Sequence, residues 1–403
     1  MNIWKDCEQV PLTSLLSFIV DNRGKTVPLI DDKNGIKLIA TNCITNESLY
    51  PVYEKVRFLS EETYKTCFRA HPRPGDIIFV NKGPPGKVAF VPDPIDFCIA
   101  QDMMAFRVNP EMVYNKYLFA VLRSAKIQEQ IRITSVGDVI PHFKKEFLDE
   151  IKIPLPDMKI QKYLGDMYFM YSEKIELNNK INTNLEQQAQ ALFKNWFVDF
   201  EPFGGKMPEG WKEKTLYEYA DFINGTSFKE DEYGTEGLPI IKIAELKNGI
   251  TEATQYFNGE KDPKYNVENG DILFSWSGNP DTSIDIFIWS LGNGILNQHT
   301  FNVKSHTNNK WFTYCLLKYF KPEFCHHASC KQTTGLGHVT ASDLKQIAFS
   351  SEDKAVSDFE NLIAPIMKHI FNNKLENQKL VNIRDTLLPK LMNGEIEVGE
   401  VII

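Results

Sequence analysis

The amino-acid sequence repeats itself: most segments between residues 12 and 151 have a counterpart about 200 residues later, in the same order. The closest pair is residues 73–79 (RPGDIIF) and residues 268–274 (ENGDILF). In both, a Gly-Asp turn opens a short apolar strand, and a polar loop containing glycine follows. An ordered repeat of this kind predicts two copies of one structural unit.

Further segments of the two copies match in strand pattern, loop position and apolar character while their side chains differ widely. Each copy also has an apolar run that is typical of a helix, before its last loop. A frame of turns and strands that persists while side chains change is what we expect of one scaffold binding two targets. The matched segments are residues 12–19 and 216–223, 35–44 and 237–246, 105–108 and 300–303, 116–124 and 310–320, and 140–143 and 336–339.

A long helix is predicted to close each copy, over residues 157–197 and 353–392. In both, apolar or polar seam residues step by three and four, which is typical of a coiled coil. We expect the two helices to pair antiparallel within one chain, and an internal brace with no other role is the alternative. The seam residues are Ile181, Leu185, Gln188 and Leu192, then Ile366, Ile370, Asn373, Asn377, Leu380, Arg384, Leu387 and Leu391.

Composition limits the class of protein. A chain of 403 residues predicts two or three domains. Its seven irregularly spaced cysteines, and the lack of a signal peptide or long apolar run, indicate a reduced compartment and a cytoplasmic protein. A net charge of -8 argues against a protein that coats DNA unaided and leaves room for local basic loops, with partners supplying affinity.

The duplicated order of motifs, GDIIF and GDILF, IPLP, LFKNWF and PEGW, closely resembles the specificity subunit of type I restriction-modification systems over essentially the whole chain. The resemblance implies an α+β fold in which two similar globular target-recognition domains alternate with two long helices. The domains would be residues 1–156 and 201–351. The helices, residues 157–200 and 352–403 with the tail, would pack as an antiparallel coiled coil in pseudo-two-fold arrangement.

The same resemblance implies that each target-recognition domain reads one half of a bipartite double-stranded DNA site and that the helices set the gap. Two methyltransferase subunits would dock on the chain and methylate adenine, and restriction subunits could join. S-adenosylmethionine, ATP and Mg would then belong to those partners, and this chain would hold no cofactor and no catalytic residue.

Candidate DNA-binding residues are the polar and basic side chains of loops that recur at matched positions in both copies, because such groups reach base edges and phosphates. Solvated turns are the alternative for each of them. In the first copy they are Asn22, Arg23, Lys25, Asn81, Lys82, Lys87, Arg132, Thr134 and Ser135. In the second they are Asn224, Thr226, Ser227, Ser275, Ser277, Asn279, Lys331, Gln332, Thr333 and Thr334.

The sequence also contains a basic cluster and a cluster of possible metal ligands. Arg69, His71 and Arg73 could clamp phosphate, although the matched stretch of the second copy is less basic and a solvated surface is favoured. Residues 325–330 (CHHASC) have zinc-ligand chemistry. Because the first copy has no Cys or His at the matched place, we expect no metal.

The sequence argues against two catalytic functions, that of a methyltransferase and that of a nucleotide-driven motor. Residues 279–281 (NPD) match only half of the tetrapeptide that amino-methyltransferases use, and no phosphate-cradling Gly-rich loop is present. Asp76 and Asp271 follow glycine at strand starts, where capping a turn explains them. The rivals are therefore an enzyme with an unfamiliar active site, and a protein-binding coiled-coil scaffold without sequence-specific DNA binding.

Overall fold

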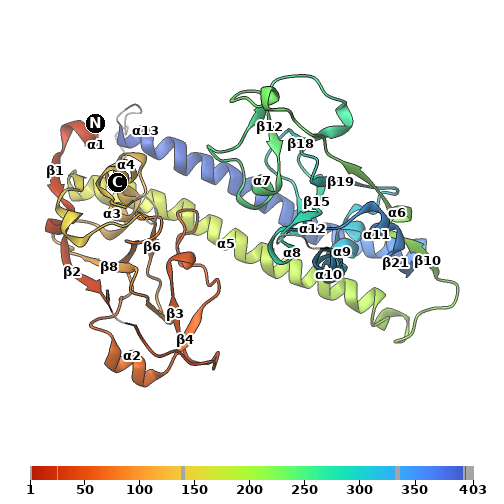
Figure 1. The fold of residues 1–403 in the computed structure, drawn as a ribbon, viewed down its shortest axis with the longest axis horizontal. Coiled ribbons are helices and arrows are strands. Elements are labelled where there is room, and N and C mark those ends of the chain that lie inside the picture. Colours follow the sequence, from red (N-terminus) through yellow and green to blue (C-terminus); the bar gives the residue numbers. More distant parts are fainter. Residues whose placement is uncertain (1, 25, 138–140, 332–335, 394, 396–403) are drawn as a thin grey trace. The chain divides into compact units, whose positions relative to one another are not determined.

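The computed structural model describes residues 2–24, 26–137, 141–331, 336–393 and 395. The chain divides into two compact units, Met1–Leu177 with Lys379–Ile403 (unit 1) and Asn178–Gln378 (unit 2). Each unit combines small sheets with helices around its own hydrophobic core (Figure 1). Within the described ranges, no helix has both the length and the apolar character needed to cross a membrane.

Unit 1 is built on a four-stranded antiparallel sheet with strand order β2-β8-β5-β6. A three-stranded sheet of order β4-β3-β7 and the pair β1-β9 complete its strands. The strands are β1 Glu8–Pro11, β2 Leu16–Asp21, β3 Ile36–Ile39, β4 Arg57–Leu59, β5 Ile77–Val80, β6 Val88–Phe90, β7 Phe97–Ile99, β8 Met103–Val108 and β9 Lys152–Leu155. Its short helices are α1 Ile3–Asp6, α2 Glu61–Cys67, α3 Asn115–Leu122 and α4 Ala125–Thr134.

Unit 2 repeats this plan. Its four-stranded sheet has the order β11-β19-β15-β17, and a second sheet has the order β13-β12-β18-β14. The strands are β10 Lys212–Thr215, β11 Ala220–Asn224, β12 Leu238–Ile241, β13 Tyr256–Phe257, β14 Asn266–Val267, β15 Ile272–Ser275, β16 Ser277–Gly278, β17 Asp285–Ile288, β18 Gly294–Leu296, β19 Thr300–Ser305, β20 Gly337–His338 and β21 Ala348–Ser351. The short helices are α6 Leu216–Tyr219, α7 Ile243–Asn248, α8 Pro280–Ser283, α9 Lys310–Tyr319, α10 Lys321–Cys330 and α11 Ala341–Gln346.

The Gly-Asp turn explains why the closest sequence match survives in both units. Gly75 and Gly270 have φ angles of 84° and 98°, in the left-handed region that favours glycine. The buried carboxylate of Asp76 accepts a hydrogen bond from the backbone N–H of Arg73 at 2.8 Å. That of Asp271 accepts one from Glu268 at 3.1 Å. Both carboxylates therefore close a turn, as the sequence predicts.

A cation across the sheet completes each turn. Nη2 of Arg107 lies 2.8 Å from a carboxylate oxygen of Asp76, and Nζ of Lys304 lies 2.5 Å from one of Asp271. Arg107 and Lys304 each follow the residue that pairs with the first residue of β5 or β15, namely Phe106 or Val303. The predicted duplication is thus confirmed down to single side-chain contacts.

Two long helices close the units. Helix α5, Met158–Phe197, has 40 residues and is about 60 Å long at ~1.5 Å per residue. Helix α12, Asp353–Asn382, contains 30 residues and leads through a π-helical turn, Ile383–Leu387, into α13, Leu388–Met392.

Within unit 2 the two helices pack antiparallel. Nδ2 of Asn178 donates to Oδ1 of Asn377 at 2.8 Å, and Nδ2 of Asn373 donates to Oδ1 of Asn182 at 2.9 Å. Contacts that advance along one helix retreat along the other, so the antiparallel pairing is confirmed. The polar residues predicted at the seam, Asn373 and Asn377, lie in it.

One predicted seam residue is wrong. Gln188 is exposed and donates to Asn184 of its own helix at 2.5 Å. The buried positions are Ala189 and Phe193. In unit 2, α5 packs on the globular core as well as on α12: the ring of Phe193 lies 5.8 Å from that of Phe312. That second contact turns the buried stripe by one residue.

Candidate nucleic-acid interface

The polar loops of unit 1 meet at one end of its four-stranded sheet. The backbone N–H of Asn81, directly after β5, donates to the carbonyl of Asp102 at 3.1 Å. The N–H of Phe143 donates to the carbonyl of Asn81 at 2.7 Å, and Lys82 pairs with His142 in an isolated bridge. These segments and the turn after β2 line an open hollow with a volume of about 420 Å³. It is lined by Arg23, Gly24, Asn81, Lys82, Gln101, Asp102, His142, Phe143 and Lys144.

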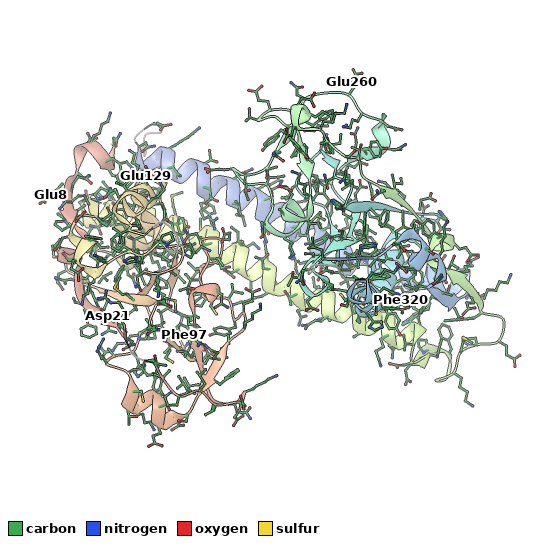
Figure 2. The ribbon with its side chains drawn as sticks, viewed as in Figure 1. Glu8, Asp21, Phe97, Glu129, Glu260 and Phe320 are labelled. Carbon is green, nitrogen blue, oxygen red and sulfur yellow. The ribbon has the colours of Figure 1, made fainter. Side chains whose placement is uncertain are left out.

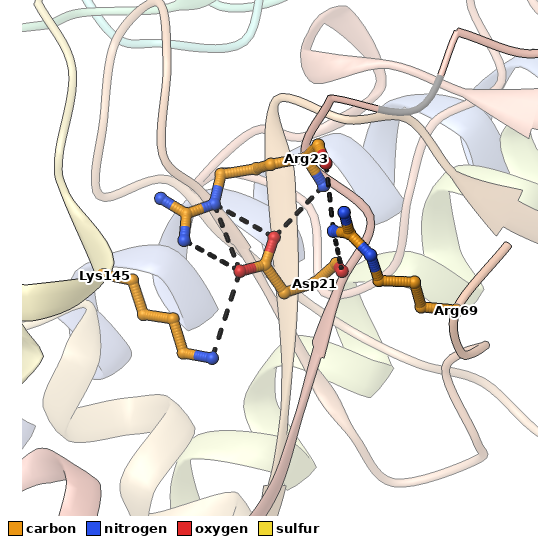
Figure 3. Close-up of polar contacts among 4 residues, drawn as sticks. All are labelled: Asp21, Arg23, Arg69 and Lys145. Atoms are coloured by element: carbon orange, nitrogen blue, oxygen red, sulfur yellow. Dashed lines mark hydrogen bonds and ion pairs between the residues drawn. The ribbon is translucent and has the colours of Figure 1, made fainter.

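A charged cluster stands at the edge of this hollow (Figure 3). Asp21 ends β2, and its carboxylate accepts from Nε of Arg23 at 3.0 Å and from Nη2 at 2.8 Å. Nζ of Lys145 lies 4.0 Å from the same carboxylate. Nη1 of Arg69 donates to the backbone carbonyls of Asp21 and Arg23 at 3.2 and 3.0 Å. Two cations, Arg23 and Lys145, thus lie against this carboxylate, and a third, Arg69, binds the backbone of the same turn.

The ionisation of Asp21 and Arg23 follows from this geometry. Burial would raise the pKa of Asp21, but the hydrogen bonds and charge of Arg23, with the charge of Lys145, outweigh it and hold that pKa below its ordinary value. The hydrogen bonds to Asp21 raise the pKa of Arg23. Both groups are therefore charged at neutral pH. Figure 2 labels Asp21 among the side chains of unit 1.

Two predicted asparagines are buried, with different surroundings. Asn22 is 1% exposed; its Nδ2 donates to the carbonyl of Ala70 at 2.9 Å and its Oδ1 accepts from the N–H of Arg69 at 3.0 Å. Asn22 therefore holds the turn in place. Asn81 is 6% exposed, and its Oδ1 has no hydrogen-bond partner among the described residues.

The other predicted residues of unit 1 do not lie together. Lys82 is exposed on the hollow and forms no ion pair with any described residue. Lys87 does not line the hollow. Arg132, Thr134 and Ser135 belong to the end of α4, where Arg132 pairs with Glu129 and the two hydroxyls donate to backbone carbonyls of the helix. Lys25 lies outside the described residues.

Unit 2 assembles the same loops with the same backbone contacts. The N–H of Trp276, directly after β15, donates to the carbonyl of His299 at 3.4 Å, and the N–H of Val339 donates to the carbonyl of Trp276 at 2.8 Å. Ser277 pairs with His338. Oδ1 of Asn224, at the end of β11, accepts from the indole Nε1 of Trp276 at 3.1 Å. The side chains of Asn224, Trp276 and Ser277 on this face are uncharged, whereas Arg23, Lys82 and Lys144 line the corresponding face of unit 1.

Three of the residues predicted for unit 2 lie together in the structure. Asn224 and Ser277 lie on this face, next to Thr226, whose N–H donates to the carbonyl of Leu296 at 2.9 Å. Ser227 is exposed.

Three other predicted residues serve local structure. Ser275 is fully buried, and Asn279 caps α8 by accepting from the N–H of Asp281 at 3.0 Å. Lys331 pairs with Asp343 at 2.6 Å. Gln332, Thr333 and Thr334 lie outside the described residues.

Sequence reasoning missed several residues of the two faces. In unit 1 these are Gln101, Asp102 and Lys144; in unit 2 they are His299 and His338. The sequence repeat could have indicated two of them, because Asp102 and His299 directly precede the matched strands β8 and β19.

The basic cluster of residues 69–73 does not act as a group. Arg69 reaches the Asp21 cluster. His71 stacks on Tyr64, with ring centroids 3.8 Å apart, and burial lowers the pKa of its imidazole. Arg73 contributes its backbone to the Gly-Asp turn.

The CHHASC segment forms the C-terminal part of helix α10. Sγ of Cys330 lies 3.6 Å from Nε2 of His326, and Nε2 of His327 lies 3.6 Å from a carboxylate oxygen of Glu323. In the parts of the chain that the structure describes, no group of three or more His, Cys, Asp or Glu side chains is placed to hold a metal ion.

Comparison with known proteins gives concordant results. A family model described as "Type I restriction modification DNA specificity domain" matches residues 5–187 and 208–384. The type I restriction enzyme MjaIX specificity subunit of Methanocaldococcus jannaschii is 29% identical over 366 residues, which cover 85% of this chain and 83% of that protein. The HindI specificity subunit of Haemophilus influenzae is 24% identical over 452 residues, covering 90% and 94%.

A solved structure is similar in fold. The S subunit of a type I restriction-modification system from M. genitalium superposes with a TM-score of 0.54 and 18% identity, covering 96% of each chain. The two matched copies, the mixed α/β units and the packed long helices of the present structure agree with that architecture.

Proposed function

Because the chain belongs to the type I restriction-modification DNA specificity family, we propose that it reads one bipartite double-stranded DNA site, each unit binding one half. The family is the DNA-recognition component of such systems, and its members are named as specificity subunits and not as the catalytic subunits. The predicted non-catalytic role agrees with this.

In this proposal residues 1–156 and 201–351 are the two target-recognition domains. Residues 157–200 and 352–403 are the helical segments and tail that set the gap between half-sites. An antiparallel helix pair with matched polar contacts has a defined register, which supports a fixed spacing.

The observation that carries the proposal is the duplication of one loop assembly. In both units the residue after the central strand bridges the loop before β8 or β19 and the segment of residues 142–143 or 338–339. Different side chains occupy this shared frame: Arg23 and Lys82 in unit 1, Asn224 and Ser277 in unit 2. A common frame with different polar groups suits two readers of different base sequences.

The family supplies the candidate partners, and the charge of the chain agrees with a need for them. A chain of net charge -8 with local cationic loops needs other subunits for much of its DNA affinity. We propose that two methyltransferase subunits dock on it and flip the target adenine out of the stack for methylation, and that restriction subunits can join. S-adenosylmethionine, ATP and Mg would be bound by those partners and none by this chain, within the cytoplasm where the DNA lies.

The test uses the complex purified through a tag on this chain. Its binding to duplexes carrying the full site, either half alone, or a scrambled site is measured in competition with random duplex. We expect tight binding to the full site, weaker binding when one half is scrambled, and the weakest when both are. Equal binding to every duplex would contradict the proposal and favour the protein-binding scaffold.

A further inference from the structure

The turn after β2 in unit 1 holds an arginine in one fixed orientation. Asn22 anchors the turn to residues 69 and 70, and the guanidinium of Arg69 binds the carbonyls of residues 21 and 23. The backbone under Arg23 is therefore fixed from two sides. The turn therefore needs little further ordering when a ligand binds.

The guanidinium itself is oriented by Asp21. Nε and Nη2 of Arg23 both donate to this carboxylate, which leaves Nη1 and the second hydrogen of Nη2 without a partner among the described residues. These remaining hydrogens form the outer fork of the planar group. The Arg23 side chain is 37% exposed, whereas that of Asp21 is 14% exposed, so the fork is the accessible part of the pair.

An outer fork of two parallel N–H groups matches the O6 and N7 acceptors of guanine in the major groove. It also matches a phosphate, so the surroundings must decide between the two. Arg23 shares its hollow with the half-buried carboxylate Asp102 and with Asn81, whose buried Oδ1 lacks a partner. Lys82 and Lys144 of the same hollow can hold the phosphates, whereas the carboxylate of Asp102 repels a phosphate and can accept from the amino group of cytosine.

We propose that Arg23, oriented by Asp21, is a specificity-determining residue that makes the half-site of unit 1 require a G·C pair. The inference rests on the proposed function and adds to it the base pair and the residues that read it. Arg23 contacts guanine O6 and N7, while Asp102 faces the cytosine of the same pair. Asp21 acts as a positioning residue, because it touches Arg23 and not the DNA.

The matched turn of unit 2 has no arginine held by a carboxylate. Asp21 pairs with Met104 at the end of its strand, and Asn224 pairs with Phe301 at the matched place. The uncharged Asn224 occupies the position of Asp21, and its Oδ1 already accepts a hydrogen bond from Trp276. Thr226 occupies the position of Arg23. The requirement for a G·C pair at this position therefore belongs to the half-site of unit 1 alone.

The experiment measures base discrimination by the tagged complex. Every base pair of its site is replaced in turn, and the affinity of each duplex is measured for wild type, R23Q, R23K, D21N and R57Q. For wild type we expect one G·C pair in one half-site whose replacement weakens binding about 5- to 150-fold through this contact. R23Q removes the discrimination at that pair and leaves the other positions unchanged.

Two further variants separate base reading from a phosphate contact. R23K keeps the charge and loses the planar fork, so it loses the discrimination at that pair while it retains the salt dependence of binding. D21N frees the arginine and removes a negative charge, so the discrimination falls while affinity for random duplex rises. A phosphate contact would instead leave discrimination intact in R23K and raise every affinity together in D21N.

The control R57Q removes one positive charge from β4 in the same unit and should keep the wild-type pattern. The thermal midpoint of unfolding of each variant separates a folding defect from a recognition defect. Full discrimination at every position in R23K, or a uniform weakening in R23Q, overturns the inference while the proposed function stands. A wild-type complex without any base preference overturns the proposed function itself.

Discussion

Asn182 and Asn373 face one another inside the pair of long helices of unit 2, with Nδ2 of Asn373 2.9 Å from Oδ1 of Asn182. Asn178 and Asn377 form a second such pair at 2.8 Å. Asn182 and Asn373 are 7% and 9% exposed. An amide in an otherwise apolar seam weakens the pairing in free energy but penalises every register that leaves it without a partner.

Breaking one of these amide pairs is predicted to destabilise unit 2. Asn373→Leu leaves the buried amide of Asn182 without its partner, and we expect a loss of about 1–3 kcal/mol in the free energy of unfolding. The double variant N182L/N373L should recover most of that loss, because no unpaired polar group remains. Urea unfolding of the full-length chain measures both.

The matched control is Gln188→Ala on the exposed side of the same helix, which should change stability by less than about 0.5 kcal/mol. If the double variant is less stable than N373L alone, the hydrogen bond between the two amides itself stabilises the helix pair.

The buried turn carboxylate of unit 1 gives a second prediction. Asp76→Ala leaves the cation of Arg107 without its partner and the backbone N–H of Arg73 without its acceptor. We expect a loss of about 3–5 kcal/mol, as for a broken buried ion pair. Asp166→Ala removes the half-exposed partner of Lys116 and should lose no more than about 1 kcal/mol. Equal losses for the two variants in thermal or urea unfolding would contradict this account of the turn.

A third prediction concerns acid stability. Burial would raise the pKa of Asp343, but hydrogen bonds from Lys331 and Thr340 outweigh it and lower that pKa to about 2. A pKa below that of the unfolded chain adds stability that is fully present above about pH 4 and is lost as the pH falls towards 2. Wild type should therefore be more stable than D343N at pH 5, and the difference should shrink between pH 4 and pH 2.

The control for this experiment is Ser342→Ala, at an exposed and uncharged position of the same helix α11. Its stability difference from wild type should change little over the same range. A D343N difference that stays constant down to pH 2 would show that the Lys331 contact contributes nothing through its charge.

The exposed lysines of unit 1 are predicted to bind phosphate. Lys82 and Lys144 line the hollow and form no ion pair among the described residues. K82Q and K144Q should each weaken binding to all duplexes by a similar factor and reduce the slope of log affinity against log salt by about one. K65Q, on α2 and paired with Glu61, serves as the control. A change in base preference in K82Q would instead make Lys82 a base-reading residue.

Much of the fold follows from local sequence rules. The Gly-Asp turns at residues 75–76 and 270–271 demand a positive φ and a capping carboxylate, and they predict strands that the structure confirms. The seam of the helix pair was predictable from the three- and four-residue steps that include Asn373 and Asn377. The exact buried stripe was not, because Phe193 packs on a core that lies far away in sequence.

The candidate site was harder to predict for the same reason. Loop position indicated Arg23, Lys82, Asn224 and Ser277, but sequence could not tell that Asn22 serves the turn. Nor could it show that Lys331 is held by Asp343. Whether a polar side chain is free to bind depends on partners that only the folded chain brings within 3 Å.

Mapping methylated adenines across the source genome tests most directly whether the duplicated units read two half-sites. The comparison uses wild type and a unit 2 variant carrying Asn224→Ala, Ser277→Ala and His338→Ala. We predict a bipartite wild-type motif, and a variant motif that is relaxed in one half while the other half and the gap are unchanged. A motif altered in both halves, or identical in the variant, would contradict the assignment of one half-site to each unit.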